Sequence, residues 1–359
     1  MTTNGELGHD REAWAELIDL DALARWMDER DLGAGSAIEA PETLGGGTQN
    51  ILLRFSRDGR PYVLRRPPRR PRPESDEIMR REMKVLAALA GSDVPHPAFI
   101  AGEGDPAVLG TAFYLMEPVD GFNATVGLPS LHGSSPDVRR QMGEAIVDGA
   151  IALAAINPSQ AGLDDLGKLE GWLERQVPRW RAQLDSYAKF DGWSGLEELP
   201  DVDKICAWLE ANRPEKMQPG LIHGDYHLAN VMYRPDSPEL AAIVDWELSS
   251  RGDPMLDLGW LTATWRDPEE GEQRVAVTPW DGFPSLGDIV DRYLAATGRS
   301  VEDARWFSVL APFKLGAILE GSHARACAGL APKAIGDKLH EHTVSLFDRA
   351  LRRIDRPII

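Results

Sequence analysis

The stretch of the chain at positions 221–247 constrains its fold more than any other. It contains three short apolar runs, and each run begins or ends at a polar residue that could do chemistry. The first run leads into His223–Asp225, the second follows Asn230, and the third ends at Asp245. Short apolar runs bounded by polar turns are typical of buried strands, and rigid scaffolds expose reactive side chains where strands end. Asp225, Asn230 and Asp245 are therefore the strongest candidates for site residues.

These three side chains suit one kind of chemistry. Two carboxylates and an amide oxygen are the hard oxygen ligands that Mg²⁺ prefers. A carboxylate that is not needed for the metal can accept the proton of a hydroxyl group. The residue types alone therefore favour a metal-assisted reaction at a hydroxyl.

Composition excludes several classes of protein. The 359 residues include 57 Asp and Glu against 39 Lys and Arg, a formal net charge of −18, which argues against a nucleic-acid partner. With 43% hydrophobic residues, the chain can bury a core, and its length favours two domains. The two cysteines, Cys206 and Cys327, lie far apart without metal-type spacing. No secretory leader and no apolar run of about 18 residues is evident, so we expect a cytoplasmic protein without a membrane partner.

The first third of the chain favours a small sheet. Residues 11–30 have helical apolar spacing, and Asp58-Gly59 predicts a hairpin that joins strands at 51–55 and 62–64. A helix is predicted at 75–90, with Ser75 as its N-cap and with Glu82 on its inward face, where a carboxylate needs a partner. A buried strand is predicted at 111–117, and the pattern becomes mainly helical from about 137.

The segment HGDYHLAN, residues 223–230, resembles the signature of the aminoglycoside phosphotransferase family, and its spacing is similar to that of the catalytic loop of protein kinases. The resemblance covers roughly residues 44–260. It implies an α+β, protein-kinase-like fold with two lobes. The expected domains are a β-rich N-lobe with N-terminal helices at 1–116, a hinge at 117–120, and a helical C-lobe at 121–359.

The resemblance also implies roles for individual residues. Asp225 would be the catalytic base, while Asn230 and Asp245 would hold Mg²⁺ against the phosphates of ATP. His223 and Asp257 would support the catalytic loop without taking part in the chemistry.

The nucleotide would be held by three parts of the N-lobe and hinge. Arg65 takes the place of the family's phosphate-binding lysine, and Glu82 takes the place of its helix partner. A glycine-rich turn would cover the phosphates, and the backbone of the hinge would contact adenine. The turn residues are Gly46, Gly47, Thr48, Gln49 and Asn50, and the hinge residues are Met116, Glu117 and Val119.

Two departures from the family pattern stand out. Arg65, or its neighbour Arg66, stands where relatives have lysine, and the helix ending at residues 153–158 lacks the histidine motif of many relatives. The sequences VLRRPP and REMKVLAAL look most like the branch related to the kinase module associated with acyl-CoA dehydrogenases. This suggests an acceptor other than an antibiotic.

Two groups of polar residues are further candidates for binding the acceptor. The arginines between positions 65 and 72 are typical of a solvated loop, but they could also hold an anionic group such as a coenzyme A phosphate. Relatives bind the acceptor with C-lobe helices, so a polar residue of the helix at 313–325 could contact it. The residues concerned are Glu320, His323 and Arg325.

The leading hypothesis is an ATP- and Mg²⁺-dependent phosphotransferase that acts on a hydroxyl of a small molecule. The acceptor would be aminoglycoside-like, a hydroxyacyl-CoA or another hydroxylated metabolite. One alternative is a metal-dependent hydrolase in which His223, Asp225 and His227, alternating along a strand, bind the metal on one face. A second alternative is a pseudokinase that binds nucleotide but is catalytically weak, because the family lysine is absent.

Overall fold

The structure is a computed structural model that describes residues 15–16, 18–45, 50–267 and 276–358. The chain divides into two compact units. Unit 1 comprises residues 1–120 and 244–247, and unit 2 comprises residues 121–243 and 248–359. The hinge at 117–120 stays a prediction.

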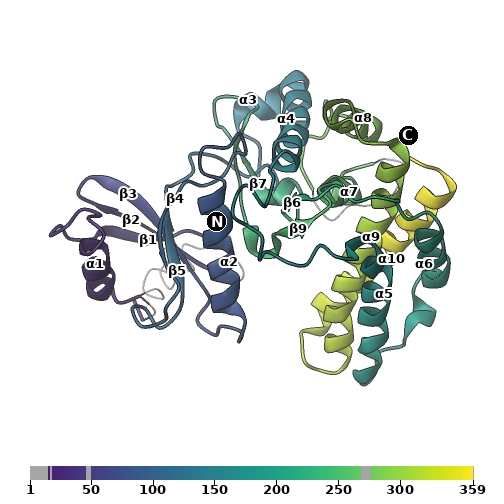
Figure 1. The fold of residues 1–359 in the computed structure, drawn as a ribbon, viewed down its shortest axis with the longest axis horizontal. Helices are drawn as coiled ribbons and strands as arrows, with labels where there is room; N and C mark the ends of the chain where they lie inside the picture. The colour runs from purple at the N-terminus through teal and green to yellow at the C-terminus, as the bar shows by residue number, and fades with distance from the viewer. Residues whose placement is uncertain (1–14, 17, 46–49, 268–275, 359) are drawn as a thin grey trace, which may run out of the picture. The chain divides into compact units, whose positions relative to one another are not determined.

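Unit 1 contains a five-stranded antiparallel sheet in the order β1-β2-β3-β5-β4 (Figure 1). The predicted hairpin is confirmed, because Arg57 at the end of β2 pairs with Arg60 at the start of β3. Both turn residues have positive φ, 51° for Asp58 and 71° for Gly59, as a two-residue turn between twisted strands requires. The strands are β1 (Glu39–Thr43), β2 (Ile51–Arg57), β3 (Arg60–Arg66), β4 (Phe99–Glu103) and β5 (Phe113–Met116).

Two helices cover the two faces of this sheet (Figure 1). Helix α1 (Leu20–Asp28) packs on an apolar face that includes Leu64 of β3. The next residue, Arg65, points to the opposite face, because side chains alternate along a strand. There it meets Glu82 of helix α2 (Ser75–Ala88), which is fully buried. The alternation of side chains along β3 thus places apolar residues on one face of the sheet and Arg65 on the other, polar face.

Helix α2 begins where it was predicted to begin, but Ser75 does not act as its N-cap. Ser75 is the first residue of the helix, and Glu74 precedes it without a side-chain cap. The hydroxyl of Ser75 accepts a hydrogen bond from the backbone N–H of Arg72, at 2.9 Å. The serine therefore closes the turn before the helix, and this use of its hydroxyl competes with N-capping.

Unit 2 is mainly helical and contains two short antiparallel ribbons. Strand β6 (Gly220–Ile222) pairs with β9 (Ser250–Gly252), and β7 (Val231–Tyr233) pairs with β8 (Leu240–Ile243). Helices α5, α9 and α10 lie side by side (Figure 1). The α-helices are α3 (Ser130–Ser134), α4 (Pro136–Ala154), α5 (Trp172–Asp185), α6 (Val202–Ala211), α7 (Met255–Thr264), α8 (Leu286–Thr297), α9 (Val301–Cys327) and α10 (Lys333–Asp355). Short 3₁₀ turns span Ser186–Lys189, Leu196–Glu198, Leu228–Asn230 and Trp246–Leu248.

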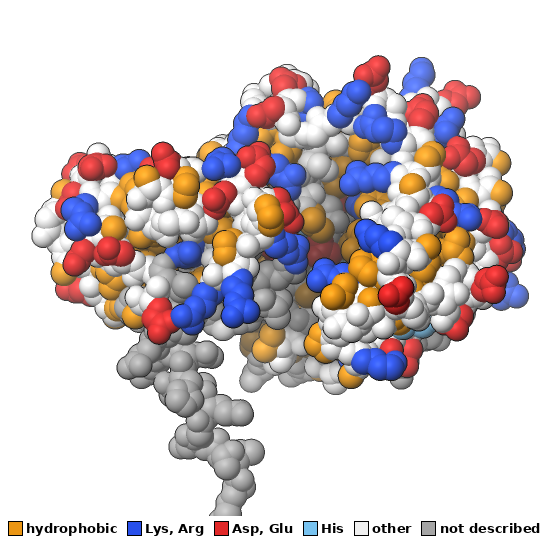
Figure 2. All heavy atoms as spheres, turned by 90° about the horizontal axis from the view of Figure 1, so that it is seen from below, with side chains coloured by type: hydrophobic (Ala, Val, Ile, Leu, Met, Phe, Trp, Pro, Cys, Tyr) orange, Lys and Arg blue, Asp and Glu red, His pale blue; other side chains and the backbone are white. Residues whose placement is uncertain are grey.

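The surface shows no segregation of charge on the face drawn in Figure 2, where acidic and basic side chains are interspersed. Within the described ranges, every helix is too short or too polar to cross a lipid bilayer. The cytoplasmic location stays a prediction.

Helix α7 packs tightly against the centre of α9. A Cβ atom at Gly259 would lie 2.5 Å from the carbonyl oxygen of Phe307 and 3.0 Å from Cβ of Ala311. The nearer obstacle is backbone, which cannot rotate away as a side chain can. Glycine at position 259 therefore sets the distance between the two helices.

We expect Gly259→Ala to lower the free energy of unfolding by about 2 kcal/mol, because the added methyl group must push α7 away from α9. Urea denaturation followed by tryptophan fluorescence measures the change. Gly127→Ala is the matched control, since no atom lies within 4 Å of its added Cβ. Equal stability of the two variants would show that the close approach is not a constraint.

Candidate functional site

The polar face of unit 1 is organised by Arg65. Its Nε lies 2.8 Å from Oε2 of Glu82, and one of its terminal nitrogens donates to Oδ1 of Asp245, also at 2.8 Å. The hydroxyl of Tyr114 donates to Glu82 at 2.9 Å. Burial raises the pKa of Glu82, and the guanidinium and the tyrosine hydroxyl oppose that rise. The structure therefore joins four residues, of which the sequence analysis singled out three and missed Tyr114.

Three carboxylates of unit 1 come close enough to hold one cation. Glu82, Asp245 and Glu247 offer oxygen atoms that all lie within 4.8 Å of one another. Burial raises the pKa of Glu247, and the negative charges of Asp245 and Glu82 raise it further. A bound cation would relieve this repulsion. Sequence reasoning missed Glu247, although its position two residues after Asp245 was a usable signal.

Asp245 has an unusual backbone conformation. Its φ is +67°, in the left-handed region that residues other than glycine seldom adopt. Such backbone strain is found most often at functional sites. Asp245 also keeps 41% of its side chain exposed while Arg65 is bonded to one oxygen. This leaves part of the carboxylate accessible to a ligand.

The other predicted nucleotide contacts are only partly described. Gly46, Gly47, Thr48 and Gln49 lie outside the described residues, and Asn50 is half-buried directly before β2. Met116 is the last residue of β5. Glu117 donates its N–H to the carbonyl of Ala98 at 2.9 Å and pairs its carboxylate with Arg60 at 2.9 Å. No described residue hydrogen-bonds the backbone of Val119.

In unit 2, Asp225 is held by three side-chain donors. Its Oδ1 accepts hydrogen bonds from Nε1 of Trp260 at 2.8 Å and from Nε2 of His227 at 3.1 Å. Its Oδ2 accepts one from Nδ2 of Asn230 at 2.9 Å. Burial alone would raise the pKa of Asp225, but the two histidines and the Trp260 bond hold it well below its ordinary value. The carboxylate is therefore ionised and fixed in orientation.

Asn230 turns its amide nitrogen inward. Nδ2 donates to both the backbone carbonyl and the carboxylate of Asp225, each at 2.9 Å. No described donor reaches its side-chain oxygen. An amide oriented in this way presents its oxygen to a ligand such as a metal ion.

The loop that carries Asp225 is held by a buried carboxylate on α7. Asp257 accepts hydrogen bonds from the backbone N–H of His223 at 2.7 Å and of Gly224 at 2.9 Å. Nδ1 of His223 in turn accepts the N–H of Asp225 at 3.3 Å. Burial raises the pKa of Asp257 to about 7, against the two N–H bonds and the positive charge of Lys314. Both residues make the contacts expected of supports for the loop.

The geometric premise of the hydrolase alternative was wrong. Residues 223–227 form a loop and not a strand, because Gly224 turns the chain at φ +88°. Nδ1 of His227 accepts the N–H of Ala229, so its Nε2 carries the proton that is donated to Asp225. His223 uses Nδ1 in the same way. Backbone N–H donors therefore orient the imidazole rings of both histidines. His223, Asp225 and His227 are also not among the groups of described residues that could hold a metal.

Sequence reasoning also missed a cation close to Asp225. Nζ of Lys314, on α9, lies 4.8 Å from the ring centre of Trp260 and 5.5 Å from that of Trp180. Both distances are in the range of cation–π contacts. Burial lowers the pKa of Lys314 to about 8, although the nearby charges of Asp257 and Asp225 favour its protonated form. No carboxylate in the described ranges lies within 4.0 Å of it.

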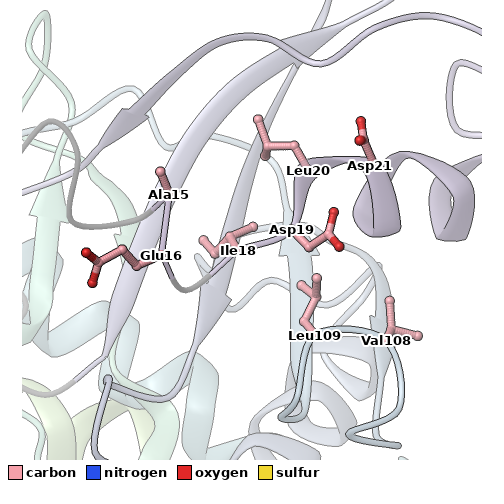
Figure 3. Close-up of a pocket in the computed structure, with 8 residues that line it drawn as sticks. All are labelled: Ala15, Glu16, Ile18, Asp19, Leu20, Asp21, Val108 and Leu109. Atoms are coloured by element: carbon pink, nitrogen blue, oxygen red, sulfur yellow. The ribbon is translucent and has the colours of Figure 1, made fainter.

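The predicted cluster of arginines does not gather at one place. Arg65 lies on the polar face of unit 1, whereas Arg66 is buried on the other face of β3. Arg69 is exposed and pairs with Glu16. A depression beside α1 is lined by apolar and acidic residues, with Glu16, Asp19 and Asp21 as its charged members (Figure 3). The acidic lining makes this depression unsuited to bind phosphate groups.

Comparison with known proteins agrees with these observations. Human acyl-CoA dehydrogenase family member 11 is 29% identical over 322 residues, which cover 87% of this chain and 40% of the relative. The chain spans only 27% to 40% of the length of the first curated relatives that it matches.

Solved structures show the same fold. A candidate aminoglycoside phosphotransferase from Ralstonia eutropha has a TM-score of 0.76 at 27% identity, covering 93% of this chain and 98% of that one. An aminoglycoside phosphotransferase in complex with AMP-PNP and hygromycin B has a TM-score of 0.55 at 14% identity, with 89% and 98% covered. The fold is therefore protein-kinase-like. The defining pattern of the phosphotransferase enzyme family matches residues 42–288, and the chain belongs to that family.

Proposed function

We propose that this protein transfers the γ-phosphoryl group of ATP to a hydroxyl group of a small molecule, with Mg²⁺ as cofactor. The observation that supports this most is the geometry around Asp225. An ionised carboxylate is fixed by Trp260, His227 and Asn230, and 30% of its side chain remains exposed. Phosphoryl transfer needs positioning and charge stabilisation more than covalent catalysis, and a fixed carboxylate provides the positioning.

Asp225 would accept a hydrogen bond from the acceptor hydroxyl and orient its oxygen for attack. A carboxylate with a lowered pKa is a weak base, so it takes the proton only once the oxygen has begun to bond to phosphorus. The Trp260 and His227 bonds keep Oδ1 occupied. The role of Asp225 is thus to orient the hydroxyl first and to receive its proton late.

The residues available for a metal fit Mg²⁺. In unit 1, Asp245 would supply carboxylate oxygen, with Glu247 close by, and in unit 2 Asn230 would supply an amide oxygen that no described donor reaches. All are hard oxygen ligands of the kind that Mg²⁺ prefers. When bound, Mg²⁺ would neutralise charge on the phosphates of the nucleotide.

Arg65 would hold the phosphates in place of the family lysine. It makes the ion pair with Glu82 that a lysine would make, and its second contact to Asp245 ties it to the proposed metal ligand. Gly46, Gly47, Thr48, Gln49 and Asn50 stay the predicted phosphate turn, and Met116, Glu117 and Val119 stay the predicted adenine contacts. The absent lysine was the main reason for the pseudokinase alternative. Arg65 provides the same positive charge and the same Glu82 partner, which weakens that reason.

The surroundings of Asp225 favour an acceptor with a negatively charged or strongly polar oxygen near its hydroxyl. Among the described residues Lys314 has no carboxylate partner, and the exposed Arg179 nearby on α5 adds a second positive charge. A cationic aminoglycoside would be repelled here, whereas a hydroxy acid or a hydroxyacyl-CoA would be attracted. We therefore propose an anionic acceptor, in keeping with the relatives named for acyl-CoA dehydrogenases.

We expect Asp225→Ala to lower kcat by about 10³-fold while ATP binding stays within about twofold of the wild type, because Asp225 orients the acceptor and not the nucleotide. Asp245→Ala should instead lose Mg²⁺-dependent ATP binding. ADP release is measured with a panel of hydroxy acids, hydroxyacyl-CoA esters, ethanolamine and aminoglycosides. ATP affinity is measured by calorimetry with and without Mg²⁺.

Asp236→Ala is the control for these two variants, since Asp236 is an exposed carboxylate of unit 2. It should match the wild type in both assays. Full activity of Asp225→Ala on an acceptor that the wild type phosphorylates would refute the proposed mechanism. ATP binding by the wild type without transfer to any member of the panel would favour the pseudokinase alternative.

For an anionic acceptor of that panel, we expect the KM of the wild type to rise at least about tenfold between about pH 7 and pH 9. The pKa of Lys314 is lowered to about 8, so its ammonium loses its proton, and with it the attraction for the anion, over this range. Lys314→Gln should have a high KM at every pH, because glutamine carries no charge. Lys314→Arg should have a KM that does not change with pH, because arginine keeps its positive charge over this range. An unchanged KM in Lys314→Gln would mean that Lys314 does not contact the acceptor.

A further inference from the structure

A second group of polar side chains lies where α9 packs on α10. Glu320 and His323 come from α9, His340 comes from α10, and each offers a ligand atom within 4.8 Å of the others. Glu320 and His323 are on a different face of α9 from Lys314, because at about 100° per residue they lie roughly 240° and 180° around the helix axis from it. These side chains face α10, and the group is therefore separate from the proposed acceptor site.

Glu320 is a fully buried carboxylate, and the described residues place no permanent positive charge against it. Its Oε1 accepts a hydrogen bond from Nε1 of Trp193 at 2.7 Å, and its Oε2 lies 3.0 Å from Nδ1 of His340. Over the described ranges, no lysine or arginine nitrogen lies within 4.0 Å of it. An indole and a neutral imidazole offer Glu320 hydrogen bonds but no positive charge, and a buried negative charge needs more compensation than that.

His323 is the second observation that points to a ligand. Its relative exposure is 9%, and among the described residues its Nδ1 has no hydrogen-bond partner. The nearest carboxylate, that of Asp337, is 3.8 Å away and is already bonded to Lys333 at 2.6 Å. An imidazole nitrogen left without a partner inside a protein is costly unless something binds it.

The arrangement of the two histidine rings disfavours protonation as the remedy. The rings of His323 and His340 are stacked with centroids 4.4 Å apart and planes inclined by 29°. Two imidazolium ions at this distance would repel each other strongly. A single divalent cation would compensate Glu320 and give both histidines a partner while both rings stay neutral.

We propose that Glu320, His323 and His340 bind a divalent transition metal of the Zn²⁺ class, with water at the fourth position, and that the metal clamps α9 to α10. Two imidazoles and one carboxylate form a donor set that Zn²⁺ accepts, whereas Mg²⁺ disfavours nitrogen ligands. Bond lengths near 2.1 Å place tetrahedral ligand atoms about 3.4 Å apart, so small side-chain rotations suffice. Cys327, whose Sγ lies 3.4 Å from Nε2 of His323, flanks the group.

The test uses the full chain after removal of metals with a chelator. Zn²⁺ is titrated by calorimetry in excess Mg²⁺, which saturates the oxygen sites, and without ATP or acceptor. We expect one equivalent of Zn²⁺ to bind with a Kd in the micromolar range or below, and to raise Tm. Bound Co²⁺ should show the visible absorption of a tetrahedral site. Absence of Zn²⁺ binding by folded wild-type protein would overturn the proposal.

Three variants locate the site. His323→Ala and His340→Ala should each weaken Zn²⁺ binding at least about tenfold and abolish the Co²⁺ spectrum. At position 320 the variant is Glu320→Gln, which keeps the shape of the side chain so that the protein folds. It should also weaken Zn²⁺ binding at least about tenfold. His96→Ala is the control, because His96 lies in unit 1 and bonds the carbonyl of Val94. Zn²⁺ binding that survives His323→Ala and His340→Ala would place the metal elsewhere and refute the assignment, whatever the fate of the proposed phosphotransfer.

Discussion

The carboxylate of Asp257 is the constraint on which the geometry around Asp225 depends. From inside unit 2 it holds two successive backbone N–H groups of the loop that carries Asp225. Because buried N–H groups must be hydrogen-bonded, the loop has one well-satisfied conformation. Asp257 is itself positioned by α7, whose distance from α9 is fixed by Gly259. The orientation of the reactive carboxylate thus derives from the packing of two helices.

The same packing explains the electrostatics near Asp225. Helix α7 supplies Trp260, which donates to Asp225, and helix α9 supplies Lys314, whose ammonium lies over the Trp260 ring. One indole therefore contacts the carboxylate of Asp225 through its N–H and the ammonium of Lys314 through its face. This separates a negative and a positive group by an apolar ring. The proposed acceptor, with a hydroxyl at one end and an anionic oxygen at the other, would match that separation.

Local rules predicted much of the fold, and long-range contacts account for what they missed. The Asp58-Gly59 hairpin and the inward face of α2 follow from turn chemistry and helical spacing. Strands β1 and β4 were missed because they lie at the two edges of the sheet, where half-exposed strands lack clear alternation. Asp225, Asn230 and Asp245 could be predicted as site residues because a spaced motif carries them. Trp260 and Lys314 were not, because only the packing of α7 on α9 brings them to Asp225.

Gly224 has a consequence for how such a loop can be controlled. Its φ is +88°, and a Cβ there would lie 2.5 Å from the carbonyl oxygen of Leu248. The corresponding position in the protein-kinase motif His-Arg-Asp is an arginine, a residue type that pairs with phosphate when activation segments are ordered by phosphorylation. Position 224 has no room for such a side chain. The loop of this protein is ordered by its own packing, so its geometry is a permanent property of the fold and not a state that a phosphate-binding arginine at this position could switch on.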